Sequence, residues 1–104
     1  MAAVNPTNED EAPRPASWFV YLIECLDGSL YTGIAIDVAA RYAAHVSGKG
    51  ARYTRSHPPA VLLGSIEYPD RSGASKAEYQ IKQLKPAAKR QFFAEQKLQS
   101  NNPG

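Results

Sequence analysis

The chain has 104 residues and a hydrophobic content of 43%, which leaves room for one domain with one core and excludes wholesale disorder. Its formal net charge of +2 hides an asymmetry, because residues 1–16 hold Glu9, Asp10 and Glu11 against Arg14. The remainder is therefore mildly basic, a composition that permits a polyanionic partner without being histone-like.

The N-terminal segment, residues 1–16, is rich in Pro, Asn, Glu and Ala and shows no hydrophobic periodicity. This composition predicts a disordered tail. The segment has no apolar run that would serve as a signal peptide or a membrane span. A single cysteine, Cys25, rules out an internal disulfide and is typical of a reducing compartment. We therefore expect a soluble, cytoplasmic protein.

The folded domain is predicted to cover residues 17–98 and to begin with a β-hairpin. Residues 18–26 are apolar on both alternating faces, as in a strand that is covered on both sides. Residues 29–34 form its partner strand. Between the two runs stands the dipeptide Asp27-Gly28, the strongest short-range signal for a hairpin.

The length of the hairpin loop decides how two tyrosines of the strands, Tyr21 and Tyr31, are placed. A two-residue loop at Asp27-Gly28 would put the two phenols on opposite faces of the sheet. A three-residue loop, with a type I turn and Gly28 in a bulge, would put them on the same face. If the phenols share a site, the loop has an odd number of residues.

The next segment, residues 37–47, is predicted to be an amphipathic helix with Asp37 as N-cap and a stop at Gly48. Arg41 and His45 are one turn apart and are neighbours at the border of its apolar stripe. From there they would reach across the sheet surface without being buried. The core stripe itself consists of Val38, Tyr42 and Val46.

Residues 48–60 are predicted to form a loop that is rich in cations and flanked by glycine. Cations interleaved with an aromatic residue suit tracking of a nucleic-acid backbone combined with base stacking. In the alternative reading, the loop is only a soluble connector. The residues expected to bind nucleic acid are Lys49, Arg52, Tyr53 and Arg55.

The rest of the chain predicts a third strand and two more helices. The strand spans residues 61–67, and the helix that follows begins at a cap on Asp70 or Ser72 and runs to about residue 84. The order β-β-α-β-α-α predicts a small α/β (α+β) fold, with helices packed on a three-stranded sheet.

The last helix is predicted to run from Pro86, in its first turn, to about residue 98. Phe92 and Phe93 would hold it against the domain. Residues 99–104 are expected to be a frayed end.

Two tripeptides on the hairpin, Val20-Tyr21-Leu22 and Tyr31-Thr32-Gly33, followed by Arg41 and His45, resemble the GIY-YIG nuclease module. That module takes its name from the two tripeptides and occurs in homing endonucleases, some restriction enzymes and the excision-repair protein UvrC. The likeness is strongest to the small stand-alone bacterial members and covers roughly residues 18–92. It implies the GIY-YIG fold and a divalent-metal-dependent DNA endonuclease with a role in DNA repair or processing.

The resemblance also implies roles for individual residues. Tyr31, helped by Tyr21, would activate or position the attacking water, and Gly33 belongs to the structural motif. The implied catalytic residues are Tyr21, Tyr31, Arg41, His45 and Glu78. Of these, Glu78 matches the glutamate that binds Mg²⁺ or Mn²⁺. An arginine suits a bidentate hold on the scissile phosphate, and Arg41 is also the cation that would help a phenol of ordinary pKa about 10 to act near neutral pH. His45 would contact phosphate or carry a proton.

Each of these residues also has a purely structural interpretation. Aromatic residues are enriched in strands, and Glu78 has a possible helix partner in Lys82, one turn away. A rival function is therefore a nucleic-acid-binding module that keeps the GIY-YIG fold without cleaving, and a third is a structural protein with no nucleic-acid role. For the nuclease we expect single-stranded or branched DNA rather than plain duplex as partner. The sequence leaves the oligomeric state open.

Overall fold

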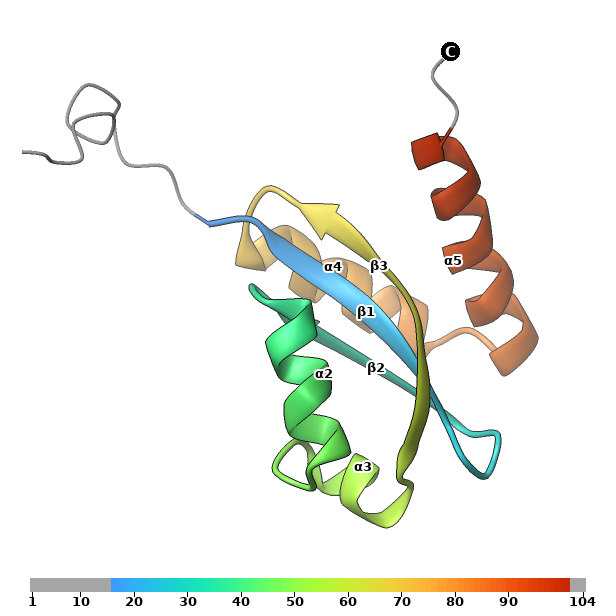
Figure 1. The fold of residues 1–104 in the computed structure, drawn as a ribbon. Helices are drawn as coiled ribbons and strands as arrows, with labels where there is room; N and C mark the ends of the chain where they lie inside the picture. The colour runs from blue at the N-terminus through green and yellow to red at the C-terminus, as the bar shows by residue number, and fades with distance from the viewer. Residues whose placement is uncertain (1–15, 102–104) are drawn as a thin grey trace, which may run out of the picture.

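A computed structural model describes residues 16–101 of the protein. Its centre is one antiparallel sheet with the strand order β2-β1-β3 (Figure 1). The strands are β1 (Trp18–Cys25), β2 (Leu30–Ala35) and β3 (Pro59–Tyr68). This architecture confirms the predicted fold class. Almost all of the predicted N-terminal tail lies outside the described residues.

The hairpin of β1 and β2 is closed by a backbone pair between Cys25 and Ser29, which leaves a three-residue loop, residues 26–28. The backbone N–H of Cys25 donates to the Ser29 carbonyl over 2.8 Å, and that of Gly28 donates to the Cys25 carbonyl over 2.9 Å. Gly28 has φ +86°, the left-handed conformation that this kind of bulged turn requires. The resulting register places Tyr21 and Tyr31 on the same face, with ring centroids 6.2 Å apart. The prediction of an odd-length loop is confirmed.

Helix α2 (Val38–Val46) begins where the sequence predicts, because the Asp37 carboxylate accepts a hydrogen bond from the Ala40 N–H over 3.0 Å. Its rotation differs from the prediction. His45 is the buried residue of the helix, with 2% of its surface exposed, whereas Val46 is 58% exposed. The predicted core stripe is wrong at Val46, and His45 does not stay unburied, because its ring finds hydrogen-bond partners inside the protein.

A short helix, α3 (Arg52–Ser56), lies within the segment 48–60 that is predicted as a loop. No side chain caps its N-terminus at Ala51. Five residues are too few to show a helical period, which is why the sequence gives no sign of it. Strand β3 then starts at Pro59, earlier than the predicted residue 61.

Two longer helices complete the fold. In α4 (Arg71–Lys82) the Asp70 carboxylate accepts from the Gly73 N–H over 2.8 Å, so Asp70 rather than Ser72 is the N-cap. Helix α5 (Pro86–Asn101) begins at the predicted proline and continues past residue 98, where the predicted helix ends. None of the described helices is long and apolar enough to cross a membrane.

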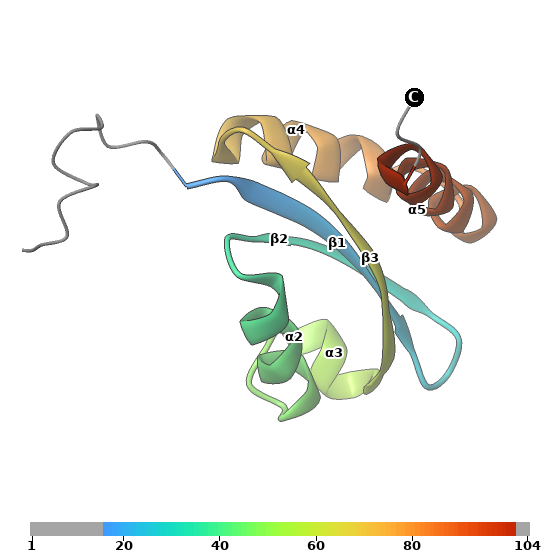
Figure 2. The same ribbon diagram turned by 45° about the horizontal axis from the view of Figure 1, so that its top comes forward.

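The helices cover the two faces of the sheet. Figure 2 shows α4 and α5 on one face and α2 and α3 on the other. Because β1 is the central strand, its alternate side chains enter two separate cores, as its two-faced apolar sequence predicts. The core on the α4–α5 side consists of Val20, Leu22, Ala74, Ile81 and Phe93. The core on the α2 side consists of Tyr21, Ile23, Cys25 and Ala35.

Candidate active site

A chain of buried polar groups crosses the core on the α2 side. The Tyr21 hydroxyl lies 2.9 Å from His45 Nε2, and His45 Nδ1 lies 2.6 Å from Thr54 Oγ1. The Thr54 hydroxyl donates its own proton to the Ala51 carbonyl over 3.0 Å. Thr54 Oγ1 therefore accepts from His45 Nδ1–H, which leaves the lone pair of Nε2 to accept from the Tyr21 O–H.

Burial sets the protonation states of these hydrogen-bonded side chains. It lowers the pKa of His45, and the nearby Arg41 charge lowers it further. Burial likewise raises the pKa of Tyr21, with the neighbouring Tyr31 and Glu78 adding to the rise and Arg41 opposing it. Near pH 7 the imidazole is neutral and the Tyr21 phenol keeps its proton. Tyr21 is thus a hydrogen-bond donor in a fixed place, not a base.

Tyr31 differs from Tyr21 in being only half-buried. Its ring centroid lies 5.1 Å from that of His45 and 5.8 Å from that of Tyr53, on which it stacks. Tyr53 in turn stacks on His57 at 4.2 Å. A row of aromatic rings therefore leads from the buried Tyr21 to the surface. Tyr31 is the phenol of the pair that is accessible from the surface.

Two glycines make room for this cluster. A Cβ on Gly33 would lie 2.5 Å from the Tyr21 hydroxyl oxygen and 3.0 Å from a ring carbon of Tyr31. A Cβ on Gly50 would collide with the His45 ring. The motif glycine thus lets two phenols lie side by side on the sheet. Sequence reasoning missed Gly50 and Thr54, because nothing local to the loop marks either of them as a neighbour of His45.

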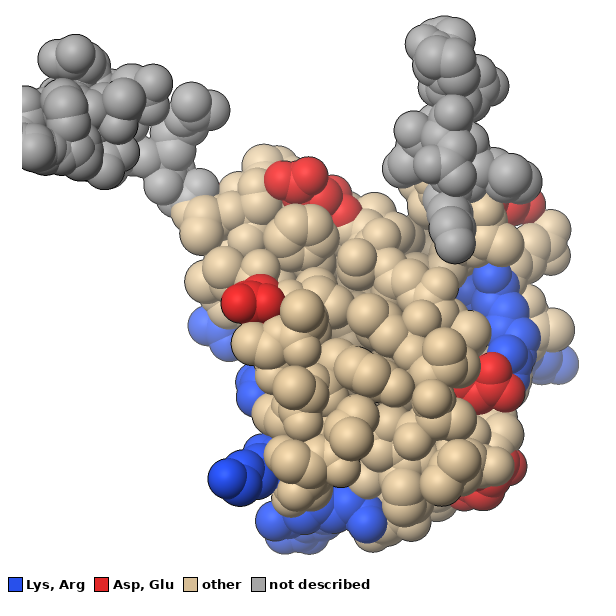
Figure 3. All heavy atoms as spheres, viewed as in Figure 1, with Lys and Arg blue, Asp and Glu red and all other residues tan. Residues whose placement is uncertain are grey.

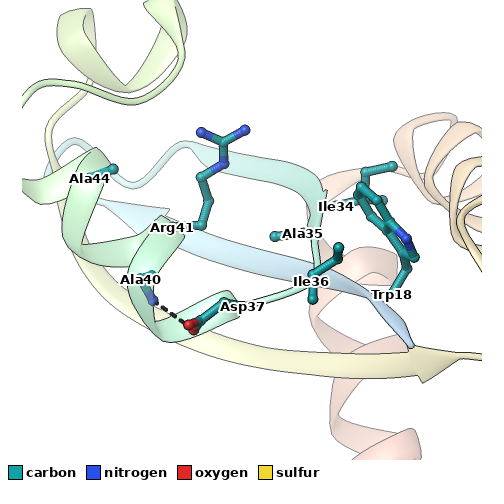
Figure 4. Close-up of a pocket in the computed structure, with 8 residues that line it drawn as sticks. All are labelled: Trp18, Ile34, Ala35, Ile36, Asp37, Ala40, Arg41 and Ala44. Carbon is teal, nitrogen blue, oxygen red and sulfur yellow. Dashed lines mark hydrogen bonds between the residues drawn. The ribbon is translucent and has the colours of Figure 1, made fainter. Parts of the chain in front are cut away.

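Arg41 extends from α2 beside a cavity of about 340 Å³, between that helix and the end of β2. In Figure 4 its guanidinium points away from Asp37, whose carboxylate is occupied in capping the helix. No described carboxylate forms an ion pair with Arg41. Its charge nevertheless acts on both Tyr21 and His45. Arg41 is available to an anionic ligand, at the exposed position that the sequence predicts.

Glu78 comes from α4, on the other face of the sheet, and its side chain is 22% exposed. Lys82 Nζ lies 3.2 Å from its carboxylate, which is the helix pair that the sequence suggests. Burial is the main cause of the raised pKa of Tyr21, and the Glu78 charge adds to it, so the carboxylate is close enough to act on that phenol. The described residues contain no group of three His, Cys, Asp or Glu side chains that could hold a metal ion. A single carboxylate fits the way Mg²⁺ binds when it keeps most of its waters.

The cations predicted to bind nucleic acid lie beyond this cluster. Lys49, Arg52 and Arg55 are all exposed, and none forms an ion pair within the part of the chain that the structure describes. Figure 3 shows Lys and Arg side chains gathered along the lower rim of the molecule, in the region of α3. Tyr53 is 38% exposed but already stacked on His57, so a base would have to share or replace that contact.

The hairpin holds two phenols over a glycine, and the helix that follows brings an arginine and a buried histidine to them. This is the arrangement of a GIY-YIG domain. The family model described as "GIY-YIG catalytic domain" matches residues 17–91. The chain belongs to this family of nuclease-type domains.

Bacterial relatives share most of its length. A UPF0213 protein of Cupriavidus necator is 50% identical over 80 residues, which are 77% of this chain and 87% of the relative. A UPF0213 protein of Desulfotalea psychrophila is 52% identical over 88 residues, covering 84% and 79% of the two chains. Among solved structures, a protein of E. faecalis determined by solution NMR is 31% identical, with a TM-score of 0.58, covering 84% of this chain and 93% of its own.

Proposed function

We propose that the protein is a divalent-metal-dependent endonuclease that hydrolyses phosphodiester bonds in DNA. The observation that carries the proposal is the convergence of two helices on the phenol pair of the hairpin. Arg41 of α2 and Glu78 of α4 both act on the pKa of Tyr21 in β1, although the two helices lie on opposite faces of the sheet. A core has no need of this combination, whereas phosphoryl transfer requires charge of both signs at the reacting group.

The different exposure of the residues supports the following division of roles. Tyr31, the half-buried phenol, would position or activate the attacking water. Tyr21 and His45 are each 2% exposed, so they would hold Tyr31 and, in the case of His45, take up or pass on a proton. Burial argues against the alternative in which His45 contacts the phosphate.

The phosphate would be bound by Arg41, whose planar guanidinium can donate two parallel hydrogen bonds to it. Glu78 is the residue that would hold the metal. A divalent ion bound there would supply positive charge for the non-bridging and leaving oxygens. Glu78 is paired with Lys82, so a metal ion has to displace that ammonium.

The substrate is proposed to be single-stranded or branched DNA. The exposed cations Lys49, Arg52 and Arg55 support backbone contacts without sequence preference, and Tyr53 offers an aromatic ring at the same end. The direct test is a cleavage panel of single-stranded, branched and duplex DNA and of RNA, with and without Mg²⁺ or Mn²⁺. Cleavage of none of them would leave the binding module as the better description.

Glu78→Gln separates cleavage from binding. The substitution keeps size and helix propensity but removes the charge that a hard cation needs. Loss of the Lys82 pair should cost only about 0.5 kcal/mol of unfolding free energy. We expect DNA affinity to persist and cleavage to fall by orders of magnitude at every Mg²⁺ concentration. Glu95→Gln, on α5, is the matched control and should cleave normally; near-parental cleavage by Glu78→Gln would place the metal elsewhere.

A further inference from the structure

A second cavity lies at the outer edge of β2, and its volume is about 240 Å³. It brings together residues from both faces of the sheet, because β2 is an edge strand and helices approach it from either side. The lining consists of Leu30, Tyr31 and Thr32 of β2, Tyr53 of α3, Lys82 of α4 and Lys89 of α5. The cavity therefore joins the accessible phenol of the candidate active site to two lysines of the opposite layer.

The two lysines differ in what neutralises them. Lys82 pairs with Glu78 over 3.2 Å. Lys89 is half-buried, and no described residue forms an ion pair with it. An ammonium without a counter-charge beside a cavity can donate charge-assisted hydrogen bonds to an anion bound there. The cavity is thus suited to a negatively charged ligand even while Lys82 is occupied.

Thr32 is a further residue of the same cavity. The residue is 3% exposed, and its hydroxyl is without a hydrogen-bond partner among the described residues. Buried hydroxyls in native proteins are nearly always paired, so this one leaves a hydrogen bond unmade next to the cavity that Thr32 lines. A phosphate group offers several acceptor oxygens in a volume that this cavity can hold.

We propose that this cavity is a second phosphate subsite, which takes a neighbouring backbone phosphate of the strand whose scissile phosphate meets Tyr31 and Arg41. The proposal rests on the proposed nuclease function. Lys89 binds the phosphate at all times. Lys82 joins it only when Glu78 is neutralised, because one carboxylate cannot pair fully with both an ammonium and a divalent ion. Occupation of Glu78 by the metal therefore strengthens the hold on the substrate.

The test measures how the affinity for a single-stranded oligonucleotide depends on salt, by fluorescence anisotropy in EDTA, where no cleavage occurs. Each phosphate contact on a single strand contributes about 0.7 to the slope of log affinity against log salt. We expect Lys89→Gln to lower the slope by about 0.7. Lys85→Gln, an exposed lysine between α4 and α5 that does not line the cavity, is the control and should leave the slope unchanged.

The exchange at Glu78 is tested in the same assay without metal. Lys82→Gln should leave the slope unchanged in the parent, where Glu78 holds the ammonium. In a Glu78→Gln background, the same substitution should lower it by about 0.7. Thermal melts of each variant establish that the fold is intact.

The outcomes distinguish the subsite from the function. A parent that binds and cleaves DNA while Lys89→Gln behaves like Lys85→Gln overturns the subsite alone. An equal effect of Lys82→Gln in both backgrounds, or no effect in either, overturns the exchange. A parent that shows no salt-sensitive binding to DNA overturns the proposed function and the subsite together.

Discussion

At the scale of single residues, the decisive feature is the buried imidazole of His45, fixed between Tyr21 and Thr54. The Thr54 hydroxyl donates its own proton to a backbone carbonyl, so His45 has to be the donor in the hydrogen bond between His45 and Thr54. The tautomer of His45 is thereby set without any charged partner. Tyr21 then becomes a donor, and Tyr31 is left as the accessible phenol.

This arrangement predicts the titration of His45. The pKa should lie below the ordinary 6.5 of histidine, because burial and Arg41 both disfavour the imidazolium. At pH values between the folded and the unfolded pKa, the unfolded chain binds more protons than the folded protein. The free energy of unfolding therefore falls as the pH drops below about 6.5. NMR titration of the imidazole, with the urea-denatured protein as reference, measures both values. A folded pKa above 6.5 would contradict the neutral tautomer.

Two substitutions of Arg41 separate the effect of its positive charge from the effect of its planar shape. Arg41→Ala should reduce cleavage about 10²–10³-fold, comparable to the loss of one transition-state donor, and should also weaken DNA binding. Arg41→Lys keeps the charge but loses the two-pronged geometry, so binding should recover much more than cleavage. Single-turnover rates together with binding constants separate the two effects. Full cleavage by the lysine variant would show that only the charge matters.

At the scale of elements, the hairpin uses two glycines for different physical reasons. Gly28 has φ +86° with open space around it, so Gly28→Ala should cost about 1–2 kcal/mol and leave the site intact. Gly33 lies against Tyr21, so Gly33→Ala forces a displacement of the phenol, at a cost of about 1–3 kcal/mol. The pKa of His45 should therefore shift in Gly33→Ala and stay constant in Gly28→Ala. Identical histidine titrations in both variants would contradict the close packing.

At the scale of the whole molecule, polar residues from both helical layers lie at the outer edge of the sheet. Lys82 belongs to one face and Tyr31 and Tyr53 to the other, and all three line one cavity at the short edge strand β2. The exposed cations at the α3 end extend this region.

The cations of that end predict a uniform contribution to binding. Replacement of Lys49, Arg52 and Arg55 together by alanine should lower the salt slope for single-stranded DNA by about 2, with little dependence on base sequence. Lys76→Ala, on α4, is the control for loss of one exposed cation elsewhere. An unchanged slope in the triple variant would make the segment a plain connector. Tyr53→Ala should weaken single-stranded binding more than duplex binding.

The sequence by itself determined the elements whose signals are local. The local signals are the apolar run in residues 18–26, the Asp27-Gly28 turn and the caps Asp37 and Asp70. Each acts through neighbours in the chain, and each is found in the structure. Tertiary structure alone decided what depends on distant packing. His45 and Thr54 are brought into contact across a loop, and β2 is an edge strand that α4 can approach. The buried histidine, the stacked Tyr53 and the lysine-lined cavity therefore have no signal in the local sequence. Hydrogen bonds and cavities join residues that are neighbours only in the folded chain, and a pattern read along the sequence carries no information about such pairs.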